Sequence, residues 1–564
     1  MNKLLFGDNL NWLRNREIFS DASVDLIYLD PPFNSKRDYA VIFKSPKGYD
    51  SEAQAEAFKD TWHWTLEAGR EFDEIIQQPN QDAAAMIQAF RSLLGVNDMM
   101  AYLTRMTIRL LELHRVLKST GSLYLHCDPT ASHYLKIVLD CIFGKENFRT
   151  EINWRRASAH NDGKQGRKQY GNVRDLIFFY TKSDDWRWNW LYTPYDESYL
   201  EENYKHIDEK GRRYRLGDLT AAKPGGDVSY EFHGTRPYKG RYWAYSRANM
   251  EKFLAEGRLY FPKNKGTPAY KRYLDEMPGV PLQNDWQDIP PVSGDEDSGY
   301  GTQKPLALLE RIISASSDEG DLVLDPFCGC GTAVLAAQKL RRKWIGIDIT
   351  SFAVAQIEDR LKKMFPENAF TEGQHRLKYI VDGLPTDFAG AKDLAAREPD
   401  GKYQFQWWAV RWLLGGQLRD GKKKGGDGGI DGVKHFTIYE SKAKFDALKK
   451  PDYKKIGTII ISVKAGENVS PSMVKDLIAT IARERAEIGL FVTLAKPTAG
   501  MITEAATAGF YQMPNGKKYP RVQVLSVEGL MNKTERAEHP DYEPDVNYAA
   551  AAAEANAEQT GLNL

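Results

Sequence analysis

The clearest indication of the fold class is Asp321-Leu322-Val323-Leu324-Asp325-Pro326-Phe327-Cys328-Gly329-Cys330-Gly331-Thr332. A short apolar run ends at Asp325, a glycine-rich turn follows, and helical spacing of apolar residues begins at Ala333. A second apolar run then ends at Asp348. Because a strand, a tight turn, a helix and a second strand form a βαβ unit, this stretch predicts a parallel sheet covered by helices.

The same pattern occurs near the start of the chain. Val24–Leu29 is an apolar run that ends in Asp30-Pro31-Pro32, and Ser122–His126 is a second such run. From about 155 to 300 the pattern is lost, and Trp, Tyr, Arg and Lys alternate with Gly and Pro. We therefore expect 1–154 and 301–380 to form one Rossmann-like α/β sheet with helices on both faces, split by an insertion at 155–300.

Residues 403–531 predict a second, smaller α/β domain. Apolar strands are expected over Ile456–Val463 and Gly489–Leu494. The polar stretch 381–402 is interpreted as a linker, and 532–564 as a polar, alanine-rich tail.

Length and composition limit the class of protein. At roughly 150 residues per domain, 564 residues predict three or four folding units. A hydrophobic content of 42% excludes global disorder, and because Lys+Arg and Asp+Glu are both 77, any basic surface must be local. Four cysteines, and the absence of an apolar stretch of about 18 residues, predict a cytoplasmic protein that does not span a membrane.

The glycine-rich turn after Asp325 is typical of a ligand site. Its glycines let the backbone approach a ligand closely, and the N–H groups of the following helix face that ligand. Asp348, at the end of the next strand, can accept hydrogen bonds from a ribose diol. A turn whose glycines serve only chain reversal is the alternative, but an acid at each strand end and Phe327 inside the turn favour a site.

Asp30-Pro31-Pro32-Phe33 also follows a strand. Two prolines fix the backbone, so the Asp30 carboxylate and the Pro31 carbonyl form a rigid pair of acceptors with Phe33 beside them. Two acceptors and an aromatic ring suit an exocyclic amine on a flat base. A strand that simply stops at proline is the alternative.

Together the two motifs resemble the β class of DNA amino-methyltransferases that use S-adenosylmethionine, in which the catalytic motif precedes the target-recognition insertion and the cofactor motif comes last. Phe6-Gly7-Asp8-Asn9 and Thr302-Gln303-Lys304-Pro305 match further pieces of this pattern. In that family Asp in the first catalytic position favours adenine, whereas enzymes for the cytosine amine more often carry Ser there. The resemblance implies catalytic roles for Asp30, Pro31, Pro32 and Phe33. It implies cofactor-binding roles for Asp8, Lys304, Asp325, Phe327, Gly329, Gly331, Thr332 and Asp348.

The mechanism that the resemblance implies is direct methyl transfer to an adenine flipped out of double-stranded DNA. Asp30 and the Pro31 carbonyl accept the N–H bonds of the amine and aim its lone pair, while Phe33 stacks on the base. A local basic segment at the start of the insertion predicts DNA contacts by Arg155, Arg156, Lys164, Arg167 and Lys168. A solvated loop is the alternative interpretation of that segment.

The C-terminal domain resembles the Mrr-like branch of the PD-(D/E)xK nucleases. It carries Gly428-Gly429-Ile430-Asp431-Gly432 and, on a later strand, Ser462-Val463-Lys464. The resemblance makes Asp431, Ser462 and Lys464 candidate nuclease residues, with Asp431 as a ligand for Mg²⁺. Ser462 stands where the family has Gln or Glu, Gln406 stands where an acid often occurs, and Glu440-Ser441-Lys442 is a second candidate motif. These departures favour a DNA-binding fold that has lost cleavage over an active nuclease.

The sequence therefore predicts a site-specific DNA adenine methyltransferase fused to a nuclease-like domain, acting in restriction-modification or phage defence. A methyltransferase for the cytosine amine or for RNA is one alternative, and a DNA-binding regulator whose two folds have lost catalysis is another. A homodimer and separate restriction or defence subunits are the protein partners that this prediction admits.

Overall fold

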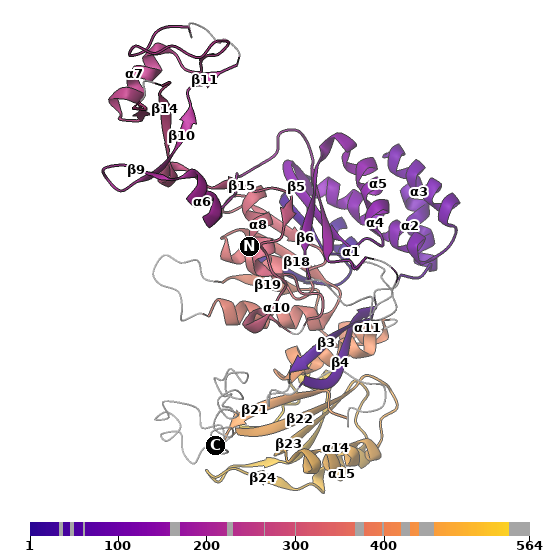
Figure 1. Ribbon diagram of the computed structural model, residues 1–564. Helices are drawn as coiled ribbons and strands as arrows, with labels where there is room; N and C mark the ends of the chain where they lie inside the picture. The colour runs from indigo at the N-terminus through magenta and orange to yellow at the C-terminus, as the bar shows by residue number, and fades with distance from the viewer. Residues whose placement is uncertain are drawn as a thin grey trace. The chain divides into compact units, whose positions relative to one another are not determined.

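The computed structural model describes residues 1–32, 38–44, 50–59, 62–157, 168, 170–222, 229–263, 266–298, 300–366, 377–397, 400–418, 429–438 and 456–540. The chain divides into two compact units (Figure 1). The larger unit comprises 1–189 and 284–564, and the smaller unit comprises 190–283.

A nine-stranded sheet forms the centre of the larger unit, in the order β16-β6-β7-β5-β2-β17-β18-β1-β19. Only β7 runs antiparallel to its neighbours in this sheet; the other strand pairs are parallel. The predicted single sheet is confirmed, since β2 from the first part of the chain pairs with β17 from the third. The strands are β1 (Asn2–Phe6), β2 (Val24–Leu29), β5 (Leu117–Cys127), β6 (Phe148–Arg155), β7 (Arg174–Thr181), β16 (Asp285–Trp286), β17 (Leu322–Asp325), β18 (Lys343–Asp348) and β19 (Tyr379–Asp382).

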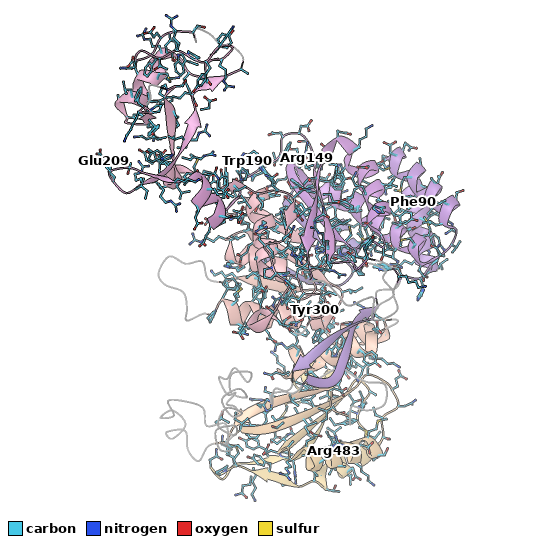
Figure 2. All side chains as sticks on the ribbon, in the orientation of Figure 1. Phe90, Arg149, Trp190, Glu209, Tyr300 and Arg483 are labelled. Carbon is cyan, nitrogen blue, oxygen red and sulfur yellow. The ribbon has the colours of Figure 1, made fainter. Side chains whose placement is uncertain are left out.

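Helices cover both faces of this sheet. On one face five helices share a single apolar core with the strands: α1 (Asn9–Arg14), α2 (Leu66–Ile76), α3 (Gln81–Leu94), α4 (Asp98–Val116) and α5 (Ser132–Phe143). Phe90 of α3, labelled in Figure 2, belongs to that core and packs edge-to-face on Tyr134 of α5, which is partly buried against it. Crossovers between parallel strands are right-handed, so helices lie on opposite faces when the chain moves across the sheet in opposite directions. The connections that lead to β17, β18 and β19 move in the opposite direction to the connection from β2 to β5. Their helices therefore lie on the other face: α8 (Leu306–Ser316), α9 (Thr332–Lys339) and α10 (Ser351–Met364).

The strand order creates a switch point between β2 and β17. From β17 the chain continues through α9 to β18 on one side, whereas from β2 it continues to β5 on the other. Ligands bind at the carboxyl ends of strands at such a point. The fold thus brings together the acids that follow β2 and end β17 and β18, which are Asp30, Asp325 and Asp348.

The smaller unit, 190–283, contains a four-stranded antiparallel sheet in the order β13-β14-β10-β9. Leu219, Phe232, Trp243 and Met250 are buried in its own apolar core. Its elements are β8 (Tyr192–Thr193), α6 (Glu197–Asn203), β9 (His206–Ile207), β10 (Arg213–Asp218), β11 (Thr220–Ala221), β12 (Tyr242–Trp243), α7 (Arg247–Ala255), β13 (Leu259–Tyr260), β14 (Ala269–Tyr273) and β15 (Val280–Pro281).

The C-terminal part of the larger unit has a five-stranded sheet in the order β20-β21-β22-β23-β26. β21 runs antiparallel to β22, and β22, β23 and β26 are parallel. Its elements are α12 (Gly401–Trp408), a π-helical turn (Ala409–Leu413), β20 (Gln417–Leu418), β21 (Gly432–Thr437), β22 (Ile456–Lys464), α14 (Pro471–Glu484), β23 (Ile488–Thr493), α15 (Ala499–Ala506), β24 (Phe510–Gln512), β25 (Lys518–Pro520), β26 (Val522–Ser526) and α16 (Val527–Met531).

One difference from the sequence prediction concerns 381–402, which is not an irregular linker. It contains α11 (Phe388–Ala396), whose N-cap Asp387 accepts a hydrogen bond from the Gly390 N–H at 2.7 Å. Ala391 and Leu394 are buried on one face of this helix. The glycines and prolines at the two ends of the stretch concealed this short apolar face.

A short hairpin lies between β2 and α2 in the sequence. It pairs β3 (Asp38–Lys44) with β4 (Asp50–Lys59). Within the described ranges, no helix combines the length and the apolar character needed to cross a membrane.

Candidate active site

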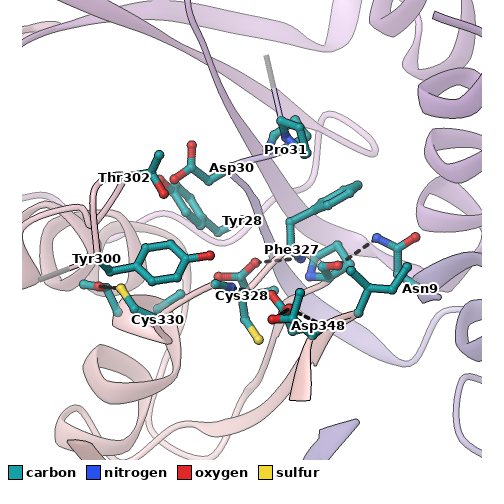
Figure 3. A pocket seen from close by; sticks show the side chains of 18 of the residues that line it. Asn9, Tyr28, Asp30, Pro31, Tyr300, Thr302, Phe327, Cys328, Cys330 and Asp348 are labelled. Atoms are coloured by element: carbon teal, nitrogen blue, oxygen red, sulfur yellow. Dashed lines mark hydrogen bonds between the residues drawn. The ribbon is translucent and has the colours of Figure 1, made fainter. Parts of the chain in front are cut away.

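A pocket of about 510 Å³ lies at the carboxyl ends of β2, β17 and β18 (Figure 3). Of the eight predicted cofactor-binding residues, seven line this pocket: Asp8, Lys304, Asp325, Phe327, Gly329, Thr332 and Asp348. The predicted catalytic residues Asp30, Pro31 and Pro32 line it as well, whereas Phe33 lies outside the described residues. The structure therefore brings both sequence motifs to one cavity.

The glycine-rich turn between β17 and α9 has a shape that side chains would prevent. Gly331 has a φ of +80°, and a Cβ there would lie 2.6 Å from the Ile357 side chain of α10. Gly331 is thus needed for the packing of the turn on α10, although it does not line the pocket. Gly329, also at positive φ, donates its N–H to Asp348 Oδ2 at 2.9 Å.

Asp348 joins this turn to the end of β18. Its Oδ1 accepts hydrogen bonds from the N–H and hydroxyl of Thr350, at 2.8 and 2.9 Å. Burial raises the pKa of Asp348 to about 6, although the hydrogen bonds from Thr350 and Gly329 act in the opposite direction. Since Oδ1 already accepts two hydrogen bonds and Oδ2 accepts one from Gly329, Oδ2 is the oxygen that retains acceptor capacity for a hydroxyl group of a ligand.

Asp325 is the most enclosed of the three acids, at 4% exposed. Burial raises its pKa well above the ordinary value, opposed by the Phe327 N–H, which donates to Oδ1 at 3.1 Å. The neighbouring charges of Asp30 and Asp348 raise it further. Asp325 is therefore placed to shape the turn around Phe327 as well as to line the cavity.

Asp30 forms an ion pair with Lys304 across 274 residues of sequence. The Lys304 ammonium donates to Asp30 Oδ2 and to the Thr302 carbonyl at 3.2 Å. The resemblance implies that Lys304 binds the cofactor, and the structure pairs its ammonium with the predicted catalytic acid. Oδ1 is the second acceptor oxygen of the same carboxylate, so Asp30 can bond a further donor.

A buried arginine that the sequence motifs did not predict braces the pocket. Arg109 of α4 is 2% exposed, and its guanidinium donates to Asp8 Oδ2 and Asn9 Oδ1, each at 2.7 Å. Asn9 in turn donates to the Pro326 carbonyl at 2.8 Å. Asp8 also caps α1, because its Oδ1 accepts the Leu10 N–H at 2.8 Å. An arginine inside the apolar pattern of Met99–Leu117 was the available signal for this network.

A second missed network crosses β2, β5 and β7. His126 Nδ1 lies 3.2 Å from the Tyr28 hydroxyl, and its Nε2 lies 3.0 Å from Asp175 Oδ2. Burial and the charge of Asp30 raise the pKa of Tyr28, which lines the pocket. Burial opposes ionisation of Asp175, but the hydrogen bond from His126 and the charges around it hold its pKa below the ordinary value. The network thus fixes a pocket-lining ring two residues before Asp30.

Comparison with known proteins gives the family of this site. The family model described as "DNA methylase" matches residues 24–359. The chain belongs to the DNA methylase family. The match covers seven of the nine strands of the central sheet, all but β1 and β19, and includes every element that contributes Asp30, Asp325 and Asp348.

Individual proteins that are similar in sequence to this chain are also named as DNA-modifying enzymes or their subunits. The chain is 29% identical over 364 residues to the Type II methyltransferase M.EcaI of Enterobacter cloacae, covering 64% of this chain and 69% of the relative. It is 28% identical over 358 residues to the StyLTI Mod subunit, part of a Type III restriction-modification enzyme of Salmonella typhimurium, covering 61% and 50%. It is 25% identical over 354 residues to the DNA adenine methyltransferase YhdJ of Escherichia coli, covering 62% and 78%. The chain thus spans only half the length of the StyLTI Mod subunit.

The residues predicted to contact DNA differ in their exposure to solvent and in their ion pairs. Arg155, at the end of β6, and Lys168 are exposed. Arg156 forms an ion pair with the buried Asp175 at 3.1 Å, so its guanidinium is tied to the network behind Tyr28. Lys164 and Arg167 lie outside the described residues.

The predicted nuclease residues of the C-terminal part also come together. Asp431 precedes β21 and is 7% exposed; its Oδ2 lies 3.5 Å from the Ser462 hydroxyl and 3.9 Å from the Lys464 ammonium. The same oxygen accepts the Val463 N–H at 2.7 Å. Glu440-Ser441-Lys442 lies outside the described residues. In the part of the chain that the structure describes, no cluster of three or more His, Cys, Asp or Glu side chains is arranged to hold a metal ion.

Proposed function

We propose that this methylase transfers a methyl group from S-adenosylmethionine to the N6 amine of an adenine in double-stranded DNA. One observation carries the proposal: the acceptor pair of Asp30 and Pro31 lines the same cavity as the glycine-rich turn and Asp348. A cofactor at the turn and a base at Asp30 would then meet inside one pocket.

The residues of the cavity fit this cofactor. Asp348 offers its Oδ2 to a hydroxyl of the ribose diol, and Gly329 lets the backbone approach the ligand. The Asp30 carboxylate gives the pocket a negative group toward a cationic sulfonium. When bound, S-adenosylmethionine supplies an electrophilic methyl group.

The chain's own contribution to transfer is positioning. An aromatic amine is a poor nucleophile because its lone pair delocalises into the ring. Acceptance of its N–H bonds by Asp30 and the Pro31 carbonyl would localise that lone pair and aim it into the pocket. A base within a duplex cannot reach Asp30, so the adenine must be flipped out, and Phe33 is proposed to stack on it.

Two considerations support adenine as the base. Asp occupies the first catalytic position, the residue that the resemblance links to adenine. YhdJ, a relative over 62% of this chain, is named a DNA adenine methyltransferase. The order of Asp30, the insertion and Asp325 along the chain supports the β class. Methylation of the cytosine amine or of RNA remains the alternative activity.

Sequencing that reads modified bases tests the proposal directly. DNA from cells that express the chain should carry N6-methyladenine at one recurring sequence, and DNA from cells that express Asp30→Ala should carry none. Recurring N4-methylcytosine would refute adenine, and unmodified DNA with modified RNA would refute DNA as the substrate.

For recognition of the target sequence we propose the insertion at 155–300, which contains the 190–283 unit, together with the basic segment Arg155 to Lys168. Separate restriction subunits are proposed as partners, since one relative is named as the Mod subunit of a restriction-modification enzyme. Homodimerisation remains a prediction.

For the C-terminal part we propose a nuclease-related fold that contacts DNA without cutting it. Mg²⁺ prefers several oxygen ligands, whereas the described centre offers the Asp431 carboxylate, a serine hydroxyl and a lysine amine. Asp431 Oδ2 already accepts a backbone N–H. This donor set fits Mg²⁺ poorly, so no cleavage step is derived from it.

A further inference from the structure

Helix α12, at the start of the C-terminal part, contributes to the wall of the cofactor pocket. Asp400, at its N-cap position, lines the pocket, as do Ile349 and Thr350. Gln404 Oε1, one turn later, accepts hydrogen bonds from the Ser351 N–H at 2.8 Å and the Ser351 hydroxyl at 3.0 Å. The helix therefore reaches the segment that directly follows Asp348.

The contacts continue along the same side of the helix. The Trp407 ring packs against Phe352 of α10 with centroids 5.6 Å apart, and Arg411 forms an ion pair with Asp359. Positions 400, 404 and 407 recur at intervals of four and three residues, which places them on one helical face, and Arg411 follows in the π-helical turn Ala409–Leu413. We call the side of α12 that carries these residues the docking face. It contacts α10 from Ser351, the first residue of α10, onward.

The docking face also reaches the glycine-rich turn. Trp407 packs against an apolar cluster whose buried members are Tyr300, Cys330 and Phe352. Tyr300 and Cys330 both line the pocket, and the Tyr300 ring lies against Gly329. The turn, the end of β18 and α12 are therefore packed as one assembly around the cavity.

The other side of α12 belongs to the C-terminal part. Gln406 Nε2 donates to the Val463 carbonyl of β22 at 3.0 Å, and Phe405 and Trp408 are buried. Helix α12 is thus anchored in the C-terminal sheet by one side and docked on the methylase by the other.

We propose that Asp400 is a further cofactor-binding residue and that cofactor binding is thermodynamically linked to docking of α12. The proposal rests on the proposed use of S-adenosylmethionine. A carboxylate at this edge of the pocket, next to the residues that follow Asp348, can accept a hydrogen bond from a hydroxyl or amine at the adenosine end of the cofactor. Because linkage is reciprocal, loss of the docking contacts must weaken cofactor binding by the same factor that cofactor binding stabilises them.

Calorimetric titration of the full chain with S-adenosylmethionine tests the proposal. Asp400→Asn and Gln404→Ala should each weaken binding about two- to tenfold, the range for one hydrogen bond. Two variants on the same helix serve as controls: Lys402→Ala, at an exposed position, and Gln406→Ala, whose side chain contacts Val463. Both controls should bind within about twofold of the unmodified chain, and melting temperatures would show that all four variants are folded.

Hydrogen exchange supplies a second readout. Saturating S-adenosylmethionine should slow amide exchange over 325–350 and over 400–413 in the unmodified chain, and in Gln404→Ala it should slow exchange over 325–350 with a smaller effect over 400–413. Protection of 325–350 alone, with full affinity in Asp400→Asn and Gln404→Ala, would overturn this inference and leave the proposed function standing. Absence of binding by the unmodified chain would overturn both.

Discussion

The methylase pocket and the Asp431 centre use the same structural device with different side chains. In each, neighbouring strands bring polar residues from separate parts of the chain to one edge of a sheet: the strands are parallel around the methylase pocket, whereas β21 and β22 are antiparallel at the Asp431 centre. In the methylase pocket, the ends of three adjacent strands supply Asp30, Asp325 and Asp348. In the C-terminal centre the only acid among the three predicted residues is Asp431, facing a serine and a lysine.

This difference shows what strand-end geometry can and cannot provide. The sheet fixes where the side chains meet, but the donor set decides the chemistry. Around the methylase pocket, further residues hold the acids in place: Gly329 and Thr350 bond Asp348, and Lys304 bonds Asp30. At the Asp431 centre, the carboxylate accepts the N–H of Val463 in the neighbouring strand β22, a hydrogen bond that holds it to the sheet.

The largest expected effect lies at Asp30. Asp30→Ala should reduce methyl transfer by about a hundred- to ten-thousandfold, because it removes the acceptor proposed to aim the amine. Cofactor affinity should change little. Incorporation of a radiolabelled methyl group would measure the first effect and calorimetry the second. Retained transfer by the variant would refute the catalytic assignment.

The buried arginine should matter for stability. Arg109→Leu should lower the free energy of unfolding by about 3 to 5 kcal/mol, because Asp8 and Glu71 lose the cation between them. Arg16→Leu is the matched control: its pair with Asp21 is exposed, so its loss should cost about 1 kcal/mol or less. Urea unfolding followed by tryptophan fluorescence would compare the two. Equal midpoints would show that the Arg109 network does not brace the pocket.

The sequence was sufficient for the strands on which the pocket depends. Val24–Leu29 and the runs ending at Asp325 and Asp348 are apolar and bounded by turn residues, so their positions and the acids after them could be predicted. The parallel sheet and the shared position of the two motifs follow from general rules of α/β folds.

What could not be predicted depends on strand order and on side-chain partners far apart in sequence. The contact of His126 with Tyr28 and Asp175 requires β7 to lie beside β5, and a strand that inserts antiparallel into a parallel sheet has no local signature. The ion pair of Lys304 with Asp30 likewise joins residues 274 apart. Helix α11 was missed because its apolar face is only a few residues long.

At Asp348 the expected effect is on cofactor affinity. Asp348→Ala should weaken binding of S-adenosylmethionine by about 1 to 3 kcal/mol, the range for loss of a charge-assisted hydrogen bond. Thr350→Val is the control, since it removes one bond to Asp348 and keeps the acid. Its effect on affinity should be smaller. A change in turnover with unaltered affinity would contradict the ribose role.

The affinity for S-adenosylmethionine should depend on pH through the titration of Asp348. With a pKa of about 6 in the free protein, Asp348 is an acceptor above pH 6 and carries a proton below it. A ribose diol donates hydrogen bonds, so it binds the charged form better, and affinity should fall as the pH is lowered from 8 to 5, by up to about tenfold per unit below the pKa. In Asp348→Asn this step should vanish. Calorimetric titrations across that pH range would give both curves, and an unchanged step in the variant would assign the titration to another group.

The smallest expected effect of a substitution is at the Asp431 centre. Detection of metal-dependent DNA cleavage there would refute the contrast drawn between the two regions. A single carboxylate beside a lysine holds a hard divalent cation weakly, because Mg²⁺ needs several oxygen ligands and is repelled by an ammonium. We therefore expect no divalent metal to support cutting of methylated or unmethylated DNA. Asp431→Ala should leave DNA affinity within about twofold, since the carboxylate bonds β22 from a buried position. Nicking assays with Mg²⁺ and Mn²⁺, run with Lys464→Ala and Ser462→Glu, would decide the point. Metal-dependent cleavage by the unmodified chain that is lost in both Asp431→Ala and Lys464→Ala, and is kept or raised in Ser462→Glu, would show that this centre is a working nuclease in which the serine has replaced an acidic ligand.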